Sequence, residues 1–364
     1  MSWNGMVLNN EELLDGAPAG LRLVAKTVEH RLGVLFETES ARWQEIDPEL
    51  KVPFDALFRM IDSGGKRLRP AFCRFAFEGS GGDKDSLAII DAMAALELLH
   101  TFALIHDDIM DGSHTRRGHP TVHSSFISNH YKQLFKGESR RYGEGVAILI
   151  GDLAFVYADS LLEGAPIKTR HIFSELRIEV NIGQYLDMLG TARGNPSLEL
   201  ARKVCVYKSG KYTVERPMHI GASLAGASEE QLDELSKFGL PLGEAFQLKD
   251  DILGTFGDSI KTGKPVGEDL IEGKPTALVA YTIERANIAD RQKFVELFTS
   301  QNPKDDDLDV MLEIIQGCGA REFVEQRIGV LVEKAIDDLG TSYLDDDSKS
   351  NLSELFSYVG SRSR

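Results

Sequence analysis

Cysteine is scarce in this sequence. Only Cys73, Cys205 and Cys318 occur among 364 residues, and no two of them form a CxxC pair. Disulfide scaffolds and cysteine-based zinc sites need closely grouped cysteines, so we expect neither. The sequence suits a reducing compartment, and we expect a cytoplasmic protein.

Positive charge and long apolar runs are also lacking. The formal net charge is -16, whereas nucleic acids and anionic membranes bind basic surfaces, so we expect no nucleic-acid partner. Residues 1–10 lack the basic start and apolar run of a secretory signal. We also expect no stretch to approach the ~20 apolar residues of a spanning helix, and therefore no stable membrane insertion.

The residues that are present predict a folded, helical protein. The chain is 42% hydrophobic and 27% charged, which is an ordinary globular composition. Apolar residues recur every three or four positions, as at Leu21, Val24, Val28 and Leu32, and strand-like alternation is rare. We therefore expect an all-α fold, a large helical bundle.

The breaks between these periodic segments give the expected organisation. We predict an N-terminal lead at 1–20 and a single domain at 21–364, because no long Pro/Gly/Ser-rich linker divides the chain. The expected helices are 21–43, 53–62, 69–79, 85–111, 120–132, 143–163, 167–191, 196–221, 229–256, 274–287, 290–299, 307–317, 319–339 and 347–359.

A group of aspartates ends the apolar segment that begins at Leu96. Asp107 and Asp111 are four residues apart, with Asp108 beside them, so the first two share one helical face. Two like charges there cost a few tenths of a kcal/mol. Mg²⁺ would relieve this repulsion, because it prefers carboxylate oxygens and keeps positions open for phosphates. A solvated helix end is the alternative for such a cluster in isolation.

Arginines follow this cluster at Arg116 and Arg117. Guanidinium groups bind phosphate oxygens, often with two hydrogen bonds at once. A diphosphate cannot sit on bare aspartates, because unit charges 4 Å apart repel by roughly 4 kcal/mol at an effective dielectric of 20. Together the two groups suggest a metal-bridged diphosphate. The loop GGKRLRP at 64–70 is a second basic segment, either an anion cradle or a solvated turn.

A second acidic cluster lies near the end of the expected helix 229–256. Asp250 and Asp251 follow Gln247 by three and four residues, so all three can share a face. Further basic or polar groups that could reach phosphate oxygens stand at Lys208, Ser209, Lys264 and Lys274.

In this order the motifs resemble the trans-isoprenyl diphosphate synthase family. The GGKRLRP loop, DDIMD, RRG, a KS pair, FQxxDD and two later GK turns succeed one another between residues 64 and 275. The resemblance implies a bundle around a central cavity and a Mg²⁺-dependent prenyltransferase. It also implies a homodimer whose substrates are isopentenyl diphosphate and an allylic diphosphate (dimethylallyl, geranyl or farnesyl).

The resemblance assigns roles residue by residue. It implies magnesium ligands at Asp107, Asp108, Asp111 and Asp250, and contacts to the allylic diphosphate from Arg116, Lys208 and Lys264. The diphosphate of isopentenyl diphosphate would be bound by Gly65, Lys66, Arg69, His100 and Arg117. Gln247 would face the reacting carbons, and Ser209 and Lys274 are further candidates for substrate binding.

The second motif departs from the family pattern. The family has a third aspartate where this chain has Gly254. Asp258 follows, but Gly254 and Gly257 disfavour a continued helix, so we do not count Asp258 as a replacement. We expect activity to survive and the missing carboxylate to affect the affinity for one of the magnesium ions.

Product length depends on the residues just before the first motif. Ala103 and Phe102 stand four and five positions before Asp107, a small residue beside an aromatic one. In the family this pattern resembles geranylgeranyl diphosphate synthases, with farnesyl diphosphate as the alternative product. A terpene cyclase, a head-to-head condensing enzyme and a catalytically silent partner subunit are the rival functions.

Overall fold

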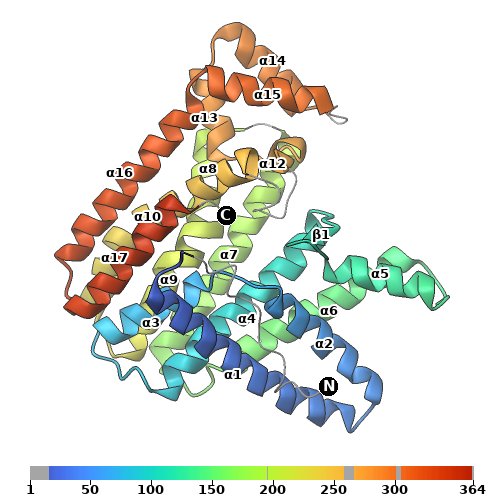
Figure 1. Ribbon diagram of the computed structural model, residues 1–364, viewed down its shortest axis with the longest axis vertical. Helices are drawn as coiled ribbons and strands as arrows, with labels where there is room; N and C mark the ends of the chain where they lie inside the picture. Colours follow the sequence, from blue (N-terminus) through green and yellow to red (C-terminus); the bar gives the residue numbers. More distant parts are fainter. Residues whose placement is uncertain (1–15, 195, 258–265, 301–304, 363–364) are drawn as a thin grey trace.

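The structure is a computed structural model that describes residues 16–194, 196–257, 266–300 and 305–362. In those ranges the chain is almost wholly helical, and its only strands are β1 (Thr115–Arg116) and β2 (His119–Pro120), paired antiparallel. The expected all-α bundle is confirmed (Figure 1).

The first part of the bundle is built around α4 (Leu87–Met110). Ser86 caps this helix by accepting the Ala88 N–H. Packed around it are helices whose buried residues recur every three or four positions, namely α1 (Ala19–Gln44), α2 (Lys51–Asp62) and α3 (Leu68–Gly79), with the short η2 (Pro48–Leu50) before α2.

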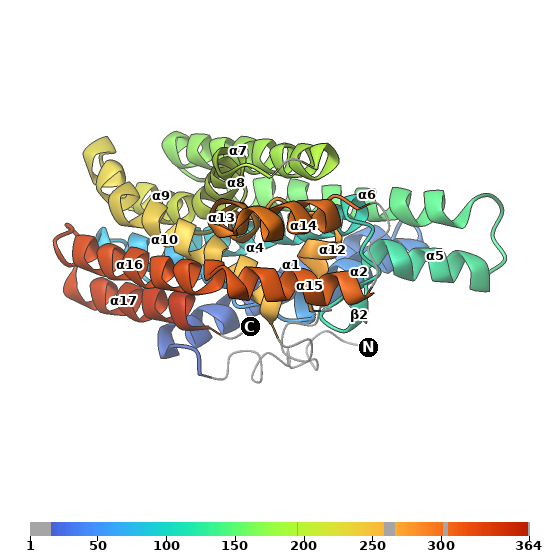
Figure 2. The same cartoon turned by 90° about the horizontal axis from the view of Figure 1, so that it is seen from above.

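Helix α4 corrects one expectation. It is the one described helix long and apolar enough to cross a membrane by length and composition, although we expected no such stretch. Yet 61% of its apolar window is buried inside the protein. Its hydrophobicity therefore belongs to a core helix, which lies between the other layers of the bundle in Figure 2.

The remaining helices complete the bundle. After the hairpin come α5 (Val122–Lys132), α6 (Ser139–Ser160), α7 (Ile167–Arg193), α8 (Leu198–Val204), the π-helical segment η3 (Cys205–Glu215), α9 (Arg216–Leu224) and α10 (Glu229–Phe256). The chain ends with α12 (Glu268–Ile271), α13 (Ala277–Arg285), α14 (Ile288–Phe298), α15 (Asp305–Gly317), α16 (Ala320–Gly340) and α17 (Asp346–Ser361).

Most predicted helices recur within a few residues of their expected ends. The predicted helix 196–221 is a continuous run, but its middle is π-helical at Cys205–Glu215. Neither the hairpin nor α12 was predicted, because two-residue strands and a single helical turn are too short for a periodic signal. The division into a lead at 1–20 and one domain at 21–364 stays a prediction, with α1 beginning at Ala19.

Two apolar cores hold the bundle together. The larger joins α1 to α4, α6, α7, α9 and α17, and the smaller joins the C-terminal half of α10 to α13, α14, α15 and α16. The main cavity touches both, since Val180 and Tyr212 come from the first and Ala201 and Ala277 from the second. The cavity therefore lies where the two cores meet.

Candidate active site

A cavity of about 1000 Å³ brings the two acidic motifs together. Its walls come from the loop before α3, from α4, α7, η3 and α10, and from the turn after α12. Asp107 enters from α4, and Asp250 from α10. Segments more than a hundred residues apart thus line one space, as the resemblance implied.

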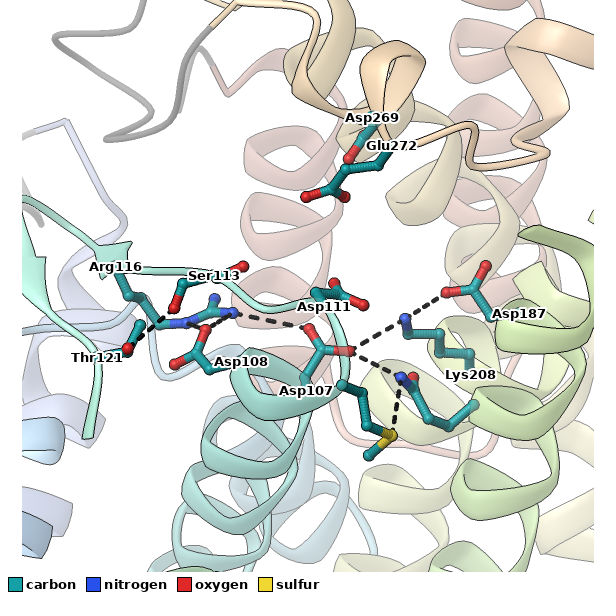
Figure 3. A network of polar contacts seen from close by, with 12 residues as sticks. Asp107, Asp108, Asp111, Ser113, Arg116, Thr121, Asp187, Lys208, Asp269 and Glu272 are labelled. Atoms are coloured by element: carbon teal, nitrogen blue, oxygen red, sulfur yellow. Dashed lines mark hydrogen bonds and ion pairs between the residues drawn. The ribbon is translucent and has the colours of Figure 1, made fainter. Parts of the chain in front are cut away.

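The aspartates of the first motif already have cationic partners. Asp107 Oδ1 lies 3.5 Å from Lys208 Nζ and accepts a 3.0 Å hydrogen bond from Gln184 Nε2. Asp111 Oδ2 lies 2.9 Å from Lys274 Nζ. Figure 3 shows Asp107 and Asp111 pointing to the same side of α4. These carboxylates are thus paired with ammonium groups, and their oxygens are of the kind that a divalent cation prefers.

Asp108 has a different environment from its neighbours. It is only 1% exposed, it does not line the cavity, and it holds the Arg116 guanidinium at 2.7 and 2.8 Å. Burial by itself would lower the pKa of Arg116, but the hydrogen bond and charge of Asp108 raise it above its usual value. Asp108 thus fixes the arginine beside Asp107, 3.7 Å away.

The hairpin places the two arginines. Gly118 adopts φ +76 and Arg117 φ +52, so the chain reverses tightly and β1 carries Arg116 back over α4. Arg117 faces the cavity beside the loop before α3. Burial and then the neighbouring Arg67 lower the pKa of Arg117 to about 10.

One end of the cavity is rich in positive charge. Gly65, Lys66, Arg69, His100 and Arg117 all line it. Burial, then Arg69 and Arg117, lower the pKa of His100 well below its usual value, so the imidazole is neutral. The mutual repulsion of these cations would be relieved by an anion such as a diphosphate.

Arg67 is the structural member of this loop. It is buried and forms ion pairs with Glu97 of α4 and, at 3.5 Å, with Glu29 of α1, and it donates to Ile61 O at 2.8 Å. Arg69 lies with its guanidinium 4.2 Å from the centre of the Tyr212 ring and donates to Thr213 Oγ1 at 2.9 Å. Arg67 therefore anchors the loop while Arg69 faces the cavity.

The π-helical segment η3 positions Lys208 and Ser209. A Cβ at Gly183 of α7 would lie 2.4 Å from Lys208 N, so only glycine allows α7 to pack this closely. Lys208 Nζ lies 2.6 Å from Asp187, and Ser209 donates to Gln247 of α10. Burial would lower the pKa of Lys208, but Asp107 and Asp187 raise it, so the ammonium stays charged.

Only one aspartate of the second motif faces the cavity openly. Asp250 is 41% exposed and lies 2.7 Å from Arg362 Nη2, which also donates to Phe246 O. Asp251 is buried, where it accepts hydrogen bonds from Gln247 Nε2 at 2.7 Å and Ala277 N at 3.0 Å. Burial, with help from Asp269 and Asp250, raises the pKa of Asp251 to about 7. Asp251 ties α10 to α13.

The apolar end of the cavity is closed by aromatic rings. Phe102 and Ala103 line it, and the Phe102 ring centre lies 4.8 Å from that of Phe155 and 4.6 Å from that of His106. Beyond Phe102, Phe155 and Ile182 line a second apolar groove between α6 and α7, and Asn181 lines both spaces. Phe102 therefore stands between the cavity and the groove.

Comparison with known proteins decides the family. The family model described as polyprenyl synthetase matches residues 51–315. The chain belongs to the polyprenyl synthetase family. A geranylfarnesyl diphosphate synthase from Aeropyrum pernix is 35% identical over 317 residues, covering 84% of this chain and 93% of the relative. A (2E,6E)-farnesyl diphosphate synthase from Mycobacterium bovis is 30% identical, covering 82% and 80%.

Solved polyprenyl synthetase structures share the fold. The geranylgeranyl pyrophosphate synthase of Corynebacterium glutamicum, complexed with isoprenyl diphosphate and magnesium, superposes with a TM-score of 0.88 at 36% identity, covering 94% of this chain and 99% of that one. The expected family is thereby confirmed, and with it a short-chain trans-prenyltransferase.

Most residues predicted for the polyprenyl synthetase site do meet in the structure. All line the cavity except three: Asp108 lies behind Arg116, Asp111 reaches the site through Lys274, and Lys264 falls outside the described residues, as does Asp258.

The cavity residues that the sequence did not reveal include Asp187, Asp269 and Arg362. Asp187 lies one helical turn after Gly183, the position at which α7 packs closely against Lys208. Arg362 carried no signal, because nothing in the sequence places the end of the chain beside Asp250.

Proposed function

We propose that this chain condenses isopentenyl diphosphate head-to-tail with an allylic diphosphate and that its main product is geranylgeranyl diphosphate. The observation that carries the proposal is the single cavity with acidic groups on two facing helices, a cationic end and an apolar end closed by Phe102. A charged head group and an isoprenoid tail each find matching chemistry there. We infer that the enzyme works in the cytoplasm.

The donor set fits Mg²⁺, the cofactor we propose. Asp107 and Asp250 offer hard carboxylate oxygens to the cavity from α4 and α10, and Asp111 lies beside Lys274, which lines it. Among the described residues no group of three or more His, Cys, Asp or Glu side chains could hold a metal ion without other ligands. This suits ions that take part of their ligands from a substrate diphosphate. When bound, Mg²⁺ would stabilise the negative charge that develops on the departing diphosphate.

The residues at the acidic end would bind the allylic diphosphate and favour its departure. Arg116, held by Asp108, and Lys208, held by Asp187, keep their positive charges beside Asp107. In this proposal they donate to the phosphate oxygens as the allylic C–O bond breaks. Lys264 and Lys274 would add further ammonium groups. The bond electrons leave with the diphosphate, and a delocalised carbocation remains.

The cationic end would orient the second substrate. Lys66, Arg69 and Arg117 bind the diphosphate of isopentenyl diphosphate, with neutral His100 as a hydrogen-bonding partner and Gly65 allowing close backbone approach. The double bond of isopentenyl diphosphate then attacks the cation and a C–C bond forms. A proton is lost to the departed diphosphate, so no side-chain nucleophile is required. Gln247 would face the reacting carbons.

Product length would be set by contact of the growing tail with Phe102. Ala103 leaves space beside it, the Phe155 ring supports it from the side of the groove, and the His106 ring packs against it within the cavity. One aromatic at this level favours geranylgeranyl diphosphate, and farnesyl diphosphate is the alternative product if the tail stops earlier.

We further propose a homodimer formed through α6 and α7. This face exposes the apolar side chains of Leu149, Val156, Ile178, Ile182 and Tyr185 in one region of two neighbouring helices. Apolar patches of this kind usually mark a protein interface. A second copy of the chain would cover it and close the groove behind Phe102.

The function is tested by incubating the purified chain with Mg²⁺, isopentenyl diphosphate and, in turn, dimethylallyl, geranyl and farnesyl diphosphates, then chromatographing the dephosphorylated alcohols. Geranylgeraniol as the end point supports the proposal, and farnesol corrects the product. No elongation, with restored activity of a second prenyl synthase chain on mixing, would instead favour a silent partner subunit.

A further inference from the structure

Helix α6 carries a regularly spaced apolar stripe on its surface. Tyr142, Leu149 and Val156 follow one another at seven-residue intervals, nearly two helical turns, so they share one face, and all three are exposed. Leu149 stands at the middle of the helix, with an apolar residue equally far on either side. Such a stripe can pair with its own copy across a two-fold axis, with the two helices antiparallel.

The two ends of α6 also carry opposite charge. The arm, which we define as residues 122–142 (α5 and the start of α6), exposes the basic side chains of Lys132, Lys136, Arg140 and Arg141. The other end of α6 exposes the acidic side chains of Asp152, Asp159 and Glu163. Arg141 and Asp159 are 18 residues apart, five turns at 3.6 residues per turn, so they lie on one side of the helix. In an antiparallel pair, Arg141 of one copy therefore meets Asp159 of the other.

The arm extends away from the rest of the bundle in both Figure 1 and Figure 2. At its tip Leu134 is 88% exposed and adopts φ +54, a backbone region that residues other than glycine rarely enter. Tyr131 and Phe135 are exposed beside it. An exposed apolar tip on a left-handed backbone gains nothing within a single copy, so we expect a partner to cover it.

Aromatic rings hold Tyr142 in a fixed position on the arm. The centre of its ring lies 5.3 Å from that of His130, 5.9 Å from that of Phe135 and 6.5 Å from that of Phe126. In the antiparallel pair Tyr142 faces Val156 of the other copy, since both stand seven residues from Leu149. Tyr142 thus offers a firm aromatic surface to the acidic end of the other α6.

The groove behind Phe102 lies at this acidic end. Phe155 of α6 lines the groove, and so does Arg177 of α7, which binds Asp159 at 2.8 Å. Asn181 lines both the groove and the main cavity. Several other lining side chains of the groove are exposed, so it is open on its outer side. In a single copy, an isoprenoid tail that passed Phe102 would reach the protein surface here.

We propose that in the homodimer the arm of the second copy covers this groove. Arg141 of the second copy pairs with Asp159, and Tyr142 of the second copy forms the outer wall of the space behind Phe102. Each product pocket is completed by the other copy, so product length depends on Phe102 in one chain and on Tyr142 in the other. This inference rests on the proposed function and on the proposed homodimer.

The test places substitutions in different copies of one dimer. An active chain with F102A is paired with an inactive chain with D107A, each with its own affinity tag, and the mixed dimer is isolated over both tags. It receives Mg²⁺, isopentenyl diphosphate and farnesyl diphosphate, and the dephosphorylated alcohols are chromatographed. Adding Y142A to the inactive chain should lengthen the products of the F102A site by at least one isoprene unit.

The matched control carries Y142A in the active chain instead. There it removes the same ring from the groove of the inactive copy, so the products should equal those of F102A paired with D107A alone. Lengthening in this arrangement, or none in the first, would overturn the proposal. If Y142A prevents folding, as seen by circular dichroism, Y142L takes its place under the same comparison.

Charge reversal tests the pairing without any catalysis. R141E and D159R should each weaken dimerisation by about tenfold in analytical ultracentrifugation, because the two-fold axis repeats each exposed pair. A mixture of the two variants should dimerise like wild type, since in the mixed dimer every 141–159 contact again joins opposite charges. Unchanged single variants, or a mixture as weak as either variant, would contradict the Arg141–Asp159 contact.

Two other results separate the possible failures. A wild-type chain that elongates substrates as a monomer contradicts the arm's role and leaves the proposed function intact, whereas a chain without elongation contradicts the function itself. Sedimentation with vesicles of phosphatidylglycerol and phosphatidylcholine that is lost in L134E, together with no effect of Y142A in the inactive chain, would assign the arm to an anionic lipid surface and overturn the proposal.

Discussion

Replacing Phe102 with alanine should lengthen the product. The ring closes the apolar end of the cavity, with the Phe155 and His106 rings 4.8 and 4.6 Å away, and Asn181 lines both the cavity and the groove beyond. Burial is worth about 0.8 kcal/mol per CH₂ group, so one further isoprene unit of five carbons gains about 4 kcal/mol once it has space. That corresponds to about a thousandfold tighter binding of the longer intermediate.

The expected loss of folding free energy in F102A is smaller than this gain in the binding free energy of the longer intermediate. A fully buried Phe→Ala change costs about 3–5 kcal/mol, but Phe102 is half-buried and faces a cavity, so F102A should lie below that range and remain folded. With farnesyl diphosphate as starter, the main product should move up by at least one isoprene unit, seen by chromatography of the dephosphorylated alcohols.

Phe155→Ala provides the matched control. It lies behind Phe102, so F155A alone should leave the main product unchanged, whereas F102A/F155A should give longer products than F102A. An unchanged product from a folded, active F102A would refute the placement of the cavity floor. Lengthening by F155A alone would move the floor to α6.

Three further predictions concern the metal site, the pH dependence and the dimer. Asp107→Ala or Arg116→Ala should reduce turnover by more than about a hundredfold with unchanged circular dichroism, and full activity in either would contradict the site. The folded-state pKa of Asp251 is raised to about 7 from its usual 3.8, so the native state holds an extra proton between these values and stability falls as pH rises through that window. D251N, melted without Mg²⁺ from pH 4 to 8, should lack this decline, and melting curves that run parallel to wild type would refute it. Ile182→Glu should give monomers by light scattering, whereas Val330→Glu, at a side chain exposed on α16, should not. A dimeric I182E variant would place the interface elsewhere.

The sequence by itself determined the class of fold and the family. Apolar residues at helical spacing set the helices, because a helix buries one stripe of its surface whatever its partner is. The four-residue spacing of Asp107 and Asp111 likewise fixes their common face, as Figure 3 shows. The ordered motifs then identified the family without any knowledge of how the helices pack.

Tertiary structure alone decided what each acidic and basic group does. Asp108 and Asp251 look like open carboxylates in the sequence, but the rotation of α4 and α10 buries one against Arg116 and the other against α13. Such rotations depend on packing between elements far apart in the chain. Lys274 meets Asp111 across 163 residues, and Arg362 meets Asp250 across 112.

The acidic group beside Gly254 illustrates the same division. The sequence showed that a carboxylate was missing from the helix. Only the packing of α12 against α10 placed Asp269 in that space. Local spacing can define which residues share a helical face, but a turn that folds back onto the helix brings in side chains that no periodicity connects to it.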